Sequence, residues 1–296
     1  MTLKSPDMSK PKRLREVLAK HTVAIPGAFN ALTGLQIEAG GYEAVYISGA
    51  GLSAARGMPD IGLLSLTEVV TEAGHIAQAL AIPAIVDADT GFGPPLTVRR
   101  AVQEFERAGV AAMQIEDQDL PKKCGHLSGK HLVSTADMAA KIRMAVQARK
   151  DPDFMLVART DARSVEGLAG AIQRARAYVE AGADAVFPEA LESREEFQEF
   201  SRAMVTAGMT VPLIANMTEF GKTPYLSLNE FEALGYRGVL FPVTMLRAAV
   251  HAIDTLLSEL KSRGTQRDCL NRIHTRQQMY DLLRYQDDEN TGTGAL

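Results

Sequence analysis

Residues 84–118 have the sequence AIVDADTGFGPPLTVRRAVQEFERAGVAAMQIEDQ, in which two short apolar runs flank an amphipathic segment. The runs 84–91 and 111–118 are mostly apolar and end in polar residues, which is typical of strands buried on both faces of a parallel sheet. Between them, 96–109 has apolar residues at helical spacing and ends at Gly109, the residue type favoured just past a helix. This stretch therefore predicts a strand–helix–strand unit with parallel strands.

The same alternation extends along the chain in both directions. Helical segments separate further predicted strands at 22–29, 44–49, 155–162, 184–190, 212–218 and 238–244. Eight parallel strands alternating with helices predict a closed (β/α)8 TIM barrel. The competing fold is a doubly wound open sheet. That fold usually carries a G-x-G-x-x-G phosphate loop after its first strand, and PGAFNALTG (26–34) does not fit this pattern.

Helices are also predicted on both sides of the barrel, and we expect one barrel domain over residues 1–296. The expected limits are 8–20 for a leading helix, about 20–250 for the barrel, 246–264 and 267–286 for C-terminal helices, and 287–296 for a disordered tail. One C-terminal helix exceeds what a barrel needs. Its apolar stripe is therefore expected to pack on a partner subunit.

Composition narrows the functional class. The 296 residues are 46% hydrophobic, which is enough for a large core, and the formal net charge of −4 argues against nucleic acid as the main partner. The two cysteines cannot form the disulfide framework of a small secreted protein. The polar N-terminus lacks the apolar core of a signal peptide, and no apolar run is long enough to span a membrane. We therefore expect a cytoplasmic protein that binds neither nucleic acid nor membranes.

Polar residues gather where the predicted strands end, which is where active sites form in this fold. They are Ser48, Asp87, Asp89, Glu116, Asp117, Arg159, Asp161, Glu189, Asn216 and Thr218. Asp87 and Asp89 are alternate residues, so both are expected to point to one face of their strand. With Glu116 they form an oxygen-only cluster without histidine, which favours Mg²⁺ or Mn²⁺ over zinc. The alternative is a structural ion pair with Arg159 or a lysine.

The loop DQDLPKKCGHLSGKH (117–131) carries the second candidate group. Cys124 is flanked by Lys122, Lys123 and His126, and nearby cations favour the thiolate. Glycines in such a loop allow it to close over a substrate and exclude water. The alternative is an ordinary surface loop that contains a cysteine. Cys269, within an amphipathic segment, is interpreted as a small buried residue without a chemical role.

Arginines on or after the strands suggest that the ligand carries carboxylates. Arg159 is well placed for bidentate binding, and Arg247 directly follows the last predicted strand. Arg276 lies far along the chain, and its position alone does not bring it to the site. None of the predicted strand ends carries a lysine, which argues against a Schiff-base aldolase and for a metal-assisted reaction.

Several motifs together give nearly the whole chain a resemblance to a known superfamily. They are VDADTGFG (86–93), IEDQ (115–118), KKCGH (122–126), ARTDA (158–162), FPEA (187–190), ANMTEFG (215–221) and GTQ (264–266). With them the chain resembles the isocitrate lyase and phosphoenolpyruvate mutase superfamily, and KKCGH resembles the signature of its lyase branch. Isocitrate lyases are much longer chains, so within this branch the chain most resembles the bacterial methylisocitrate lyases.

The resemblance implies retro-aldol cleavage of (2R,3S)-2-methylisocitrate to pyruvate and succinate, in the methylcitrate route of propionate catabolism. It implies Mg²⁺ on Asp87 and Asp89, partly through waters, with Asp60 and Glu116 supporting. It also implies a homotetramer in which a C-terminal helix is swapped between subunits. Implied substrate contacts are Ser48, Gly49, Ala50 (where the family often has glycine), Cys124, Gly125, Arg159, Glu189, Asn216, Thr218, Arg247 and Arg276.

The implied chemistry assigns three catalytic residues. Cys124 is expected to protonate the enediolate that C–C cleavage leaves, and Arg159 to stabilise its charge. Tyr46, at the end of the second predicted strand, is a weaker candidate for handling the hydroxyl proton. An apolar niche for the substrate methyl group is expected from Phe187, Leu240 and Pro242.

Three alternatives stay open. The first is a sister lyase that acts on 2,3-dimethylmalate or isocitrate. The second is an oxaloacetate decarboxylase of the same superfamily, which binds the same metal but does not need Cys124. The third, from a different class, is a non-catalytic barrel that binds a metabolite or protein. The combined presence of Asp87, Asp89 and Cys124 argues against the third.

Overall fold

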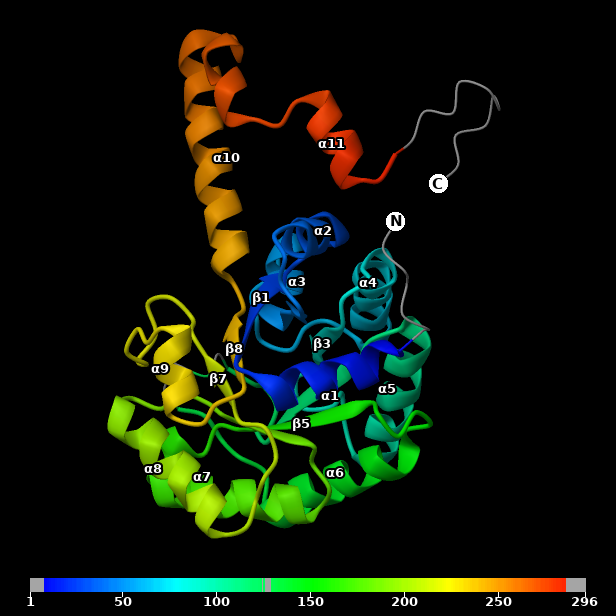
Figure 1. Cartoon of the computed structure of the whole chain (residues 1–296), viewed down its shortest axis with the longest axis vertical. Helices are drawn as coiled ribbons and strands as arrows, with labels where there is room; N and C mark the ends of the chain where they lie inside the picture. Colours follow the sequence, from blue (N-terminus) through cyan, green and yellow to red (C-terminus); the bar gives the residue numbers. More distant parts are fainter. Residues whose placement is uncertain (1–7, 124, 126–128, 286–296) are drawn as a thin grey trace.

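The computed structural model describes residues 8–123, 125 and 129–285, and eight strands of this part form one parallel barrel (Figure 1). The strands are β1 (Val23–Ala28), β2 (Val45–Ile47), β3 (Ala84–Asp87), β4 (Ala112–Glu116), β5 (Met155–Thr160), β6 (Ala185–Pro188), β7 (Ile214–Asn216) and β8 (Gly238–Phe241). Their order is β6-β5-β4-β3-β2-β1-β8-β7. A parallel bridge between Val186 and Leu213 brings β6 beside the start of β7 and completes the ring. The predicted (β/α)8 barrel is confirmed.

Helices surround this ring and follow the predicted alternation. They are α1 (Lys10–Lys20), α2 (Ala31–Ala39), α3 (Gly49–Ala55), α4 (Leu66–Ala79), α5 (Pro95–Ala108), α6 (Thr135–Ala148), α7 (Arg163–Glu180), α8 (Arg194–Thr206), α9 (Leu228–Ala233), α10 (Thr244–Arg263) and α11 (Arg276–Leu282). Gly109 follows α5 with a φ of 86°, the left-handed conformation expected of a glycine cap. Within the described ranges we found no helix with the length and apolarity needed to cross a bilayer.

The barrel interior is filled by side chains from successive strands. Ile25, Ile85 and Val157 are buried there in one apolar cluster. Leu14 and Leu18 of α1 belong to the same cluster, and Leu18 lies near Gly238 at the start of β8. α1 therefore covers the amino end of the barrel, which leaves the carboxyl end for the site.

Several strands end earlier than the sequence predicts. The predicted strand 84–91 stops at Asp87, because the chain turns at Asp89 (φ 47°) and Gly91 (φ 86°) and the Gly91 amide donates to the carbonyl oxygen of Ala88. Asp87 and Asp89 are therefore not alternate residues of one strand, and the prediction that they share a strand face is wrong. The turn nevertheless keeps the two residues in contact, since the Asp89 amide donates to Asp87 Oδ1 at 3.1 Å.

The C-terminal segment leaves the barrel as an extended arm (Figure 1). α10 buries none of its residues, and the predicted helix 267–286 is divided into a 3₁₀ helix (Arg267–Arg272) and α11. The division arises because Ile273 is extended and Thr275 caps α11 by accepting from the Gln278 amide. Packing of the arm on a partner subunit stays a prediction.

Candidate active site

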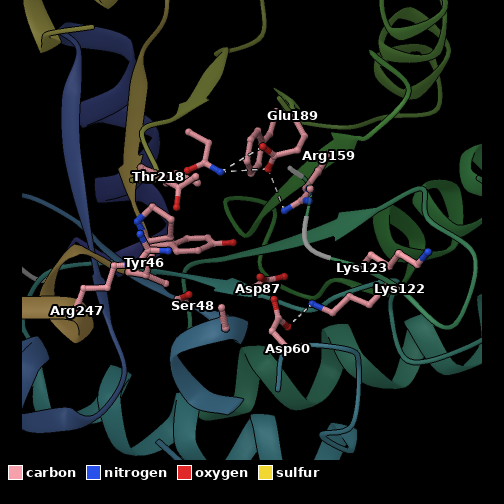
Figure 2. A pocket seen from close by; sticks show the side chains of 17 residues that line it. Tyr46, Ser48, Asp60, Asp87, Lys122, Lys123, Arg159, Glu189, Thr218 and Arg247 are labelled. Carbon is pink, nitrogen blue, oxygen red and sulfur yellow. Dashed lines mark hydrogen bonds and ion pairs between the residues drawn. The ribbon is translucent and has the colours of Figure 1, made fainter. Parts of the chain in front are cut away.

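A cavity opens at the carboxyl ends of the strands, and most of the predicted site residues line it (Figure 2). The predicted residues that line it are Tyr46, Ser48, Ala50, Asp60, Asp87, Gly125, Arg159, Glu189, Asn216, Thr218 and Arg247. Phe187, Leu240 and Pro242, expected as an apolar niche, line it too. Lys122, Lys123 and Val243 complete the lining. Cys124 lies outside the described residues, although both of its chain neighbours line the cavity.

The segment after β2 brings backbone close to Asp87. Ser48 caps α3, since its hydroxyl oxygen accepts from the Gly51 amide at 3.2 Å. Gly49 follows and is buried beside Asp87 rather than lining the cavity. A Cβ at Gly49 would lie 3.0 Å from Asp87 Oδ2, so glycine allows the Asp87 carboxylate to approach the start of the helix.

A buried lysine holds the acidic cluster together. Lys122 Nζ is 2.6 Å from Asp60 Oδ1 and also pairs with Asp89, and the lysine side chain is only 4% exposed. Burial lowers the pKa of Lys122, but the charges of the surrounding carboxylates outweigh burial and raise it well above its usual range. Burial raises the pKa of Asp89 to about 6 against the lowering effect of Lys122. Lys122 therefore stays charged between two carboxylates.

Glu116, at the end of β4, lacks full compensation for its charge. Its Oε2 is 3.3 Å from Arg159 Nε, whereas its buried Oε1 has no hydrogen-bond donor among the described residues. Burial raises the pKa of Glu116 well above its usual range, and Asp161 and Asp87 add to the increase. The described residues contain no ready-made cage of three or more His, Cys, Asp or Glu side chains. Even so, an unpartnered oxygen beside aspartates is the donor chemistry that hard divalent cations prefer.

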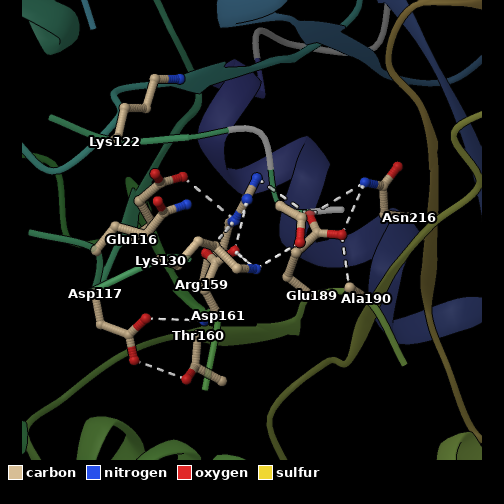
Figure 3. A network of polar contacts seen from close by, with 12 residues as sticks. Glu116, Asp117, Lys122, Lys130, Arg159, Thr160, Asp161, Glu189, Ala190 and Asn216 are labelled. Atoms are coloured by element: carbon tan, nitrogen blue, oxygen red, sulfur yellow. Dashed lines mark hydrogen bonds and ion pairs between the residues drawn. The ribbon is translucent and has the colours of Figure 1, made fainter. Parts of the chain in front are cut away.

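Arg159 of β5 lies among three carboxylates (Figure 3). Asp161 accepts from its Nε at 2.9 Å and its Nη2 at 3.1 Å, and Glu189 Oε2 is 3.2 Å from its Nη1. The guanidinium also lies 5.3 Å from the centre of the Phe187 ring. Burial lowers the pKa of Arg159, but Asp161, Glu116 and Glu189 raise it further, so the guanidinium remains charged in the cavity wall.

Asp161 is hydrogen-bonded, on the side away from the cavity, to residues that are not among the predicted site residues. Lys130 Nζ, with a fully buried side chain, donates to Asp161 Oδ1 at 2.8 Å and to the Gly125 carbonyl oxygen at 2.5 Å. The Asp161 amide donates to Asp117 Oδ1 at 2.8 Å, and Tyr178 donates to the other oxygen of Asp117. These contacts fix Asp161, and through it the Arg159 guanidinium.

Tyr46 of β2 is buried and lines the cavity. Its hydroxyl donates to Gln114 Oε1 at 2.6 Å. Burial, with a contribution from Asp87, raises the pKa of Tyr46 well above its usual range. The tyrosine therefore presents a neutral hydroxyl, and its role in handling the substrate hydroxyl proton stays a prediction.

The two other predicted arginines differ in position. Arg247 of α10 lines the cavity, and its guanidinium lies 5.2 Å from the centre of the Phe220 ring while its Nη1 donates to the Glu219 carbonyl oxygen. Arg276 begins α11 on the arm, is exposed, and does not line the cavity of its own chain.

Asn216 donates to Glu189, and its own buried Oδ1 accepts no hydrogen bond from the described residues.

Gly125 packs tightly against the ion pair of Arg159 with Glu189, so a larger residue at this position is expected to disturb the pair. A Cβ there would lie 2.4 Å from Glu189 Cγ and 2.6 Å from Arg159 Nη2. We expect Gly125→Ala to lower kcat/KM about 100-fold, because displacing positioned groups by about 1 Å has effects of this size. Steady-state kinetics check this. Gly74→Ala, where a Cβ would meet no atom closer than 3.6 Å, is the control and should retain wild-type kinetics; equal kinetics for both variants would contradict the packing argument.

Comparison with known proteins shows the family to which the chain is related. A family model described as phosphoenolpyruvate phosphomutase matches residues 14–261. The chain belongs to this family. A relative from Aeropyrum pernix named 2-methylisocitrate lyase is 51% identical over 277 residues, which cover 93% of this chain and 88% of that protein. A Bacillus subtilis protein of the same name is 46% identical, with 94% and 90% covered.

A solved structure shares the fold of this phosphoenolpyruvate phosphomutase family member. The crystal structure of 2,3-dimethylmalate lyase, described as a PEP mutase/isocitrate lyase superfamily member, superposes with a TM-score of 0.86 at 35% identity. The alignment covers 94% of this chain and 92% of that one. The predicted superfamily resemblance is confirmed.

Within this family site, the sequence interpretation missed the partners that hold the predicted residues. The sequence predicts Lys122 as a cation beside Cys124 and leaves open an ion pair of the aspartates with a lysine. The structure shows that Lys122 forms this pair, bridging Asp60 and Asp89. The sequence pattern assigns no role to Lys130 or Gln114. Gln114 had a usable signal, since a glutamine inside the apolar strand AAMQIE has to find buried hydrogen-bond partners.

Proposed function

We propose that this chain is a metal-dependent carbon–carbon lyase that cleaves (2R,3S)-2-methylisocitrate to pyruvate and succinate in propionate catabolism. One observation carries the proposal: a single cavity joins an acidic cluster around Asp87 to the charged guanidinium of Arg159. A 2-hydroxy tricarboxylate needs both, a cation at the hydroxyl end and a fixed positive charge where the enediolate forms. The similarity to proteins named 2-methylisocitrate lyase supports this substrate.

We propose Mg²⁺ as the cofactor, with Mn²⁺ as an acceptable substitute. Asp87 and Asp89 would hold it, partly through waters, with Asp60 and Glu116 supporting. The unpartnered Glu116 Oε1 and the all-oxygen donor set fit this ion. When bound, it would acidify the substrate hydroxyl and fix its orientation.

The chain's own residues would carry the rest of the reaction. Arg159, kept charged by three carboxylates, stabilises the enediolate that C–C cleavage leaves on the succinate fragment. The substrate hydroxyl proton is released to solvent and the C–C bond breaks to give the carbonyl of pyruvate, while Cys124 donates its thiol proton to the carbon that receives the bonding electron pair. Succinate is released, and the Cys124 thiolate takes up a proton from solvent. Lys123 and Gly125, the chain neighbours of Cys124, both line the cavity, which supports this role. Tyr46 contacts the substrate hydroxyl as a neutral hydrogen-bond partner.

Binding would divide the substrate between polar and apolar walls. Ser48, Asn216 and Thr218 offer hydrogen bonds, and Arg247 together with Glu189 borders the carboxylate end. Phe187, Leu240 and Pro242 form an apolar niche for the methyl group. Because a methyl group is worth only about 1–3 kcal/mol of discrimination, slow cleavage of isocitrate is expected as well.

A product assay tests the function. Purified protein with Mg²⁺ is given 2-methylisocitrate, isocitrate, 2,3-dimethylmalate and oxaloacetate in parallel. Pyruvate with succinate from 2-methylisocitrate, formed far faster than glyoxylate from isocitrate and abolished by EDTA, is the expected result. Pyruvate only from oxaloacetate, or turnover only of 2,3-dimethylmalate, would overturn the substrate but keep the metal. No turnover of any of the four would favour a metabolite-binding barrel.

A related lyase that acts on 2,3-dimethylmalate is the second candidate. It is supported by the crystal structure of 2,3-dimethylmalate lyase, which superposes at a TM-score of 0.86. This substrate lacks one carboxylate of 2-methylisocitrate. The relative kcat/KM for the two compounds therefore separates the candidates. We expect 2-methylisocitrate to be preferred, because Arg247 lines the cavity and would have no carboxylate to bind with the smaller substrate.

The exposed apolar face of the C-terminal arm supports the proposal that the protein is a homotetramer. Val250, Ile253, Leu257 and Leu260 form an apolar stripe on α10, and each is at least 41% exposed. Such a stripe is stable in water only when it is covered, and we propose that the arm of a second copy covers it. Sedimentation velocity is expected to show a tetramer. Leu257→Glu should yield smaller species, whereas Thr255→Glu, on the opposite side of the helix, should not. A monomeric wild type would contradict the proposal.

A further inference from the structure

Gln114 is a buried polar residue to which the proposed chemistry assigns no role. It lies on β4 and contacts both Asp87 on the neighbouring β3 and Tyr46 on β2, and only 1% of it is exposed. The Tyr46 hydroxyl donates to Gln114 Oε1 at 2.6 Å, and Gln114 Nε2 donates to Asp87 Oδ1 at 3.3 Å. Tyr46 and Asp87 both point into the cavity, whereas Gln114 does not line it (Figure 2).

The direction of these hydrogen bonds follows from the chemistry of the three groups. Asp87 Oδ1 acts as an acceptor here, because it also accepts from the Asp89 amide at 3.1 Å. The amide nitrogen of Gln114 therefore faces Asp87, and its carbonyl oxygen faces Tyr46. A carbonyl oxygen and a carboxylate only accept, so the proton of the Tyr46 hydroxyl is directed to Gln114 Oε1 at 2.6 Å and to the neighbouring Asp87 carboxylate, and not into the cavity. What Tyr46 presents to the cavity is a lone pair of its oxygen.

We propose that Gln114 is a positioning residue that, through Tyr46, makes the site prefer a hydroxyl over a carbonyl oxygen on the ligand. A ligand hydroxyl donates to the Tyr46 lone pair. A ketone oxygen at the same place meets another acceptor, which is repulsive and selects against it. The inference rests on the proposed function for the 2-hydroxy acid, and it means that the keto product binds less favourably than the substrate at this contact.

The test compares lactate and pyruvate as ligands of the full-length protein with Mg²⁺. The two compounds have the same carbon skeleton, and carbon 2 carries a hydroxyl in lactate and a carbonyl in pyruvate. Dissociation constants are measured by calorimetry. We expect Gln114→Met, which has similar length and no polar end, to reduce the preference for lactate about fivefold, since the Tyr46 hydroxyl then loses its 2.6 Å acceptor and can turn its proton toward the ketone. Tyr46→Phe should reduce the preference as well. In the Tyr46→Phe background, Gln114→Met should change it no further.

Each outcome decides the inference. An unchanged ratio in Gln114→Met, or an equal change with and without the Tyr46 hydroxyl, would overturn it, because Gln114 would then act otherwise than through Tyr46. If Gln114→Met does not fold, an unchanged ratio in Tyr46→Phe overturns it. So does failure of both ligands to bind the wild type. Since no turnover is measured, a hydroxyl preference without cleavage of 2-methylisocitrate would sink the proposed substrate and leave this inference standing.

Discussion

Replacing Cys124 with serine is expected to lower kcat for 2-methylisocitrate cleavage by about 10²–10⁴-fold, the usual contribution of a general acid. A thiol has a pKa of about 8.5 and can release its proton to an enediolate. A serine hydroxyl is a far weaker acid and retains its proton. Because serine is nearly isosteric, substrate binding should change little. The expected result is thus a loss in kcat with a nearly unchanged KM.

Cys269 provides the matched control for this substitution. It is the other cysteine of the chain and is buried in the 3₁₀ helix of the arm, away from the cavity. Cys269→Ser is expected to keep wild-type kcat. Retention of full lyase activity by Cys124→Ser would refute the role of the thiol. Loss of 2-methylisocitrate cleavage together with retained oxaloacetate decarboxylation would show that one site supports both reactions and that only the first needs the acid.

The sequence predicted the eight strands well because a parallel barrel strand is recognisable from its own residues. An apolar run bounded by a glycine-capped helix carries its signal locally, as at 111–118 after Gly109. The strand ends were predicted less well. Asp89 and Ala190 adopt positive φ values of 47° and 55°. Such values are uncommon for alanine, and although aspartate adopts them more often, its presence alone does not identify a turn. Tertiary contacts at the site stabilise these conformations, so the pattern along the chain does not reveal them.

The site was predicted as a set of residues but not as a set of contacts. Residue types at strand ends indicated Asp87, Arg159 and Glu189, all of which line the cavity. The pairing of Lys122 with Asp60, 62 residues apart, depends on how distant loops fold together. The position of Arg276 on an exposed arm likewise depends on the course of the chain after the barrel. Such long-range choices leave no local periodicity to detect.

Asp161→Asn is expected to lower the free energy of unfolding by about 3–5 kcal/mol, the usual cost of removing one partner from a buried ion pair. Asp161 is fully buried and accepts from both Arg159 and Lys130. An asparagine amide would direct donors at these cations and leave their charge uncompensated. With the guanidinium no longer held, kcat/KM should fall as well. Urea unfolding at neutral pH, with kinetics on the same samples, measures both effects.

The pH dependence of this stability difference follows from the pKa of Asp161. Burial alone would raise it, but Arg159 and Lys130 outweigh burial and lower it to about 2. Since an unfolded aspartate has a pKa of about 3.9, the carboxylate stabilises the fold fully above that pH and loses this contribution as the pH falls toward 2. The gap between wild type and Asp161→Asn should therefore narrow below about pH 4. Glu104→Gln, which breaks the exposed pair with Arg107, should cost no more than about 1 kcal/mol at any pH. An equally small loss for Asp161→Asn would mean that Arg159 is held in place by Glu116 and Glu189 alone.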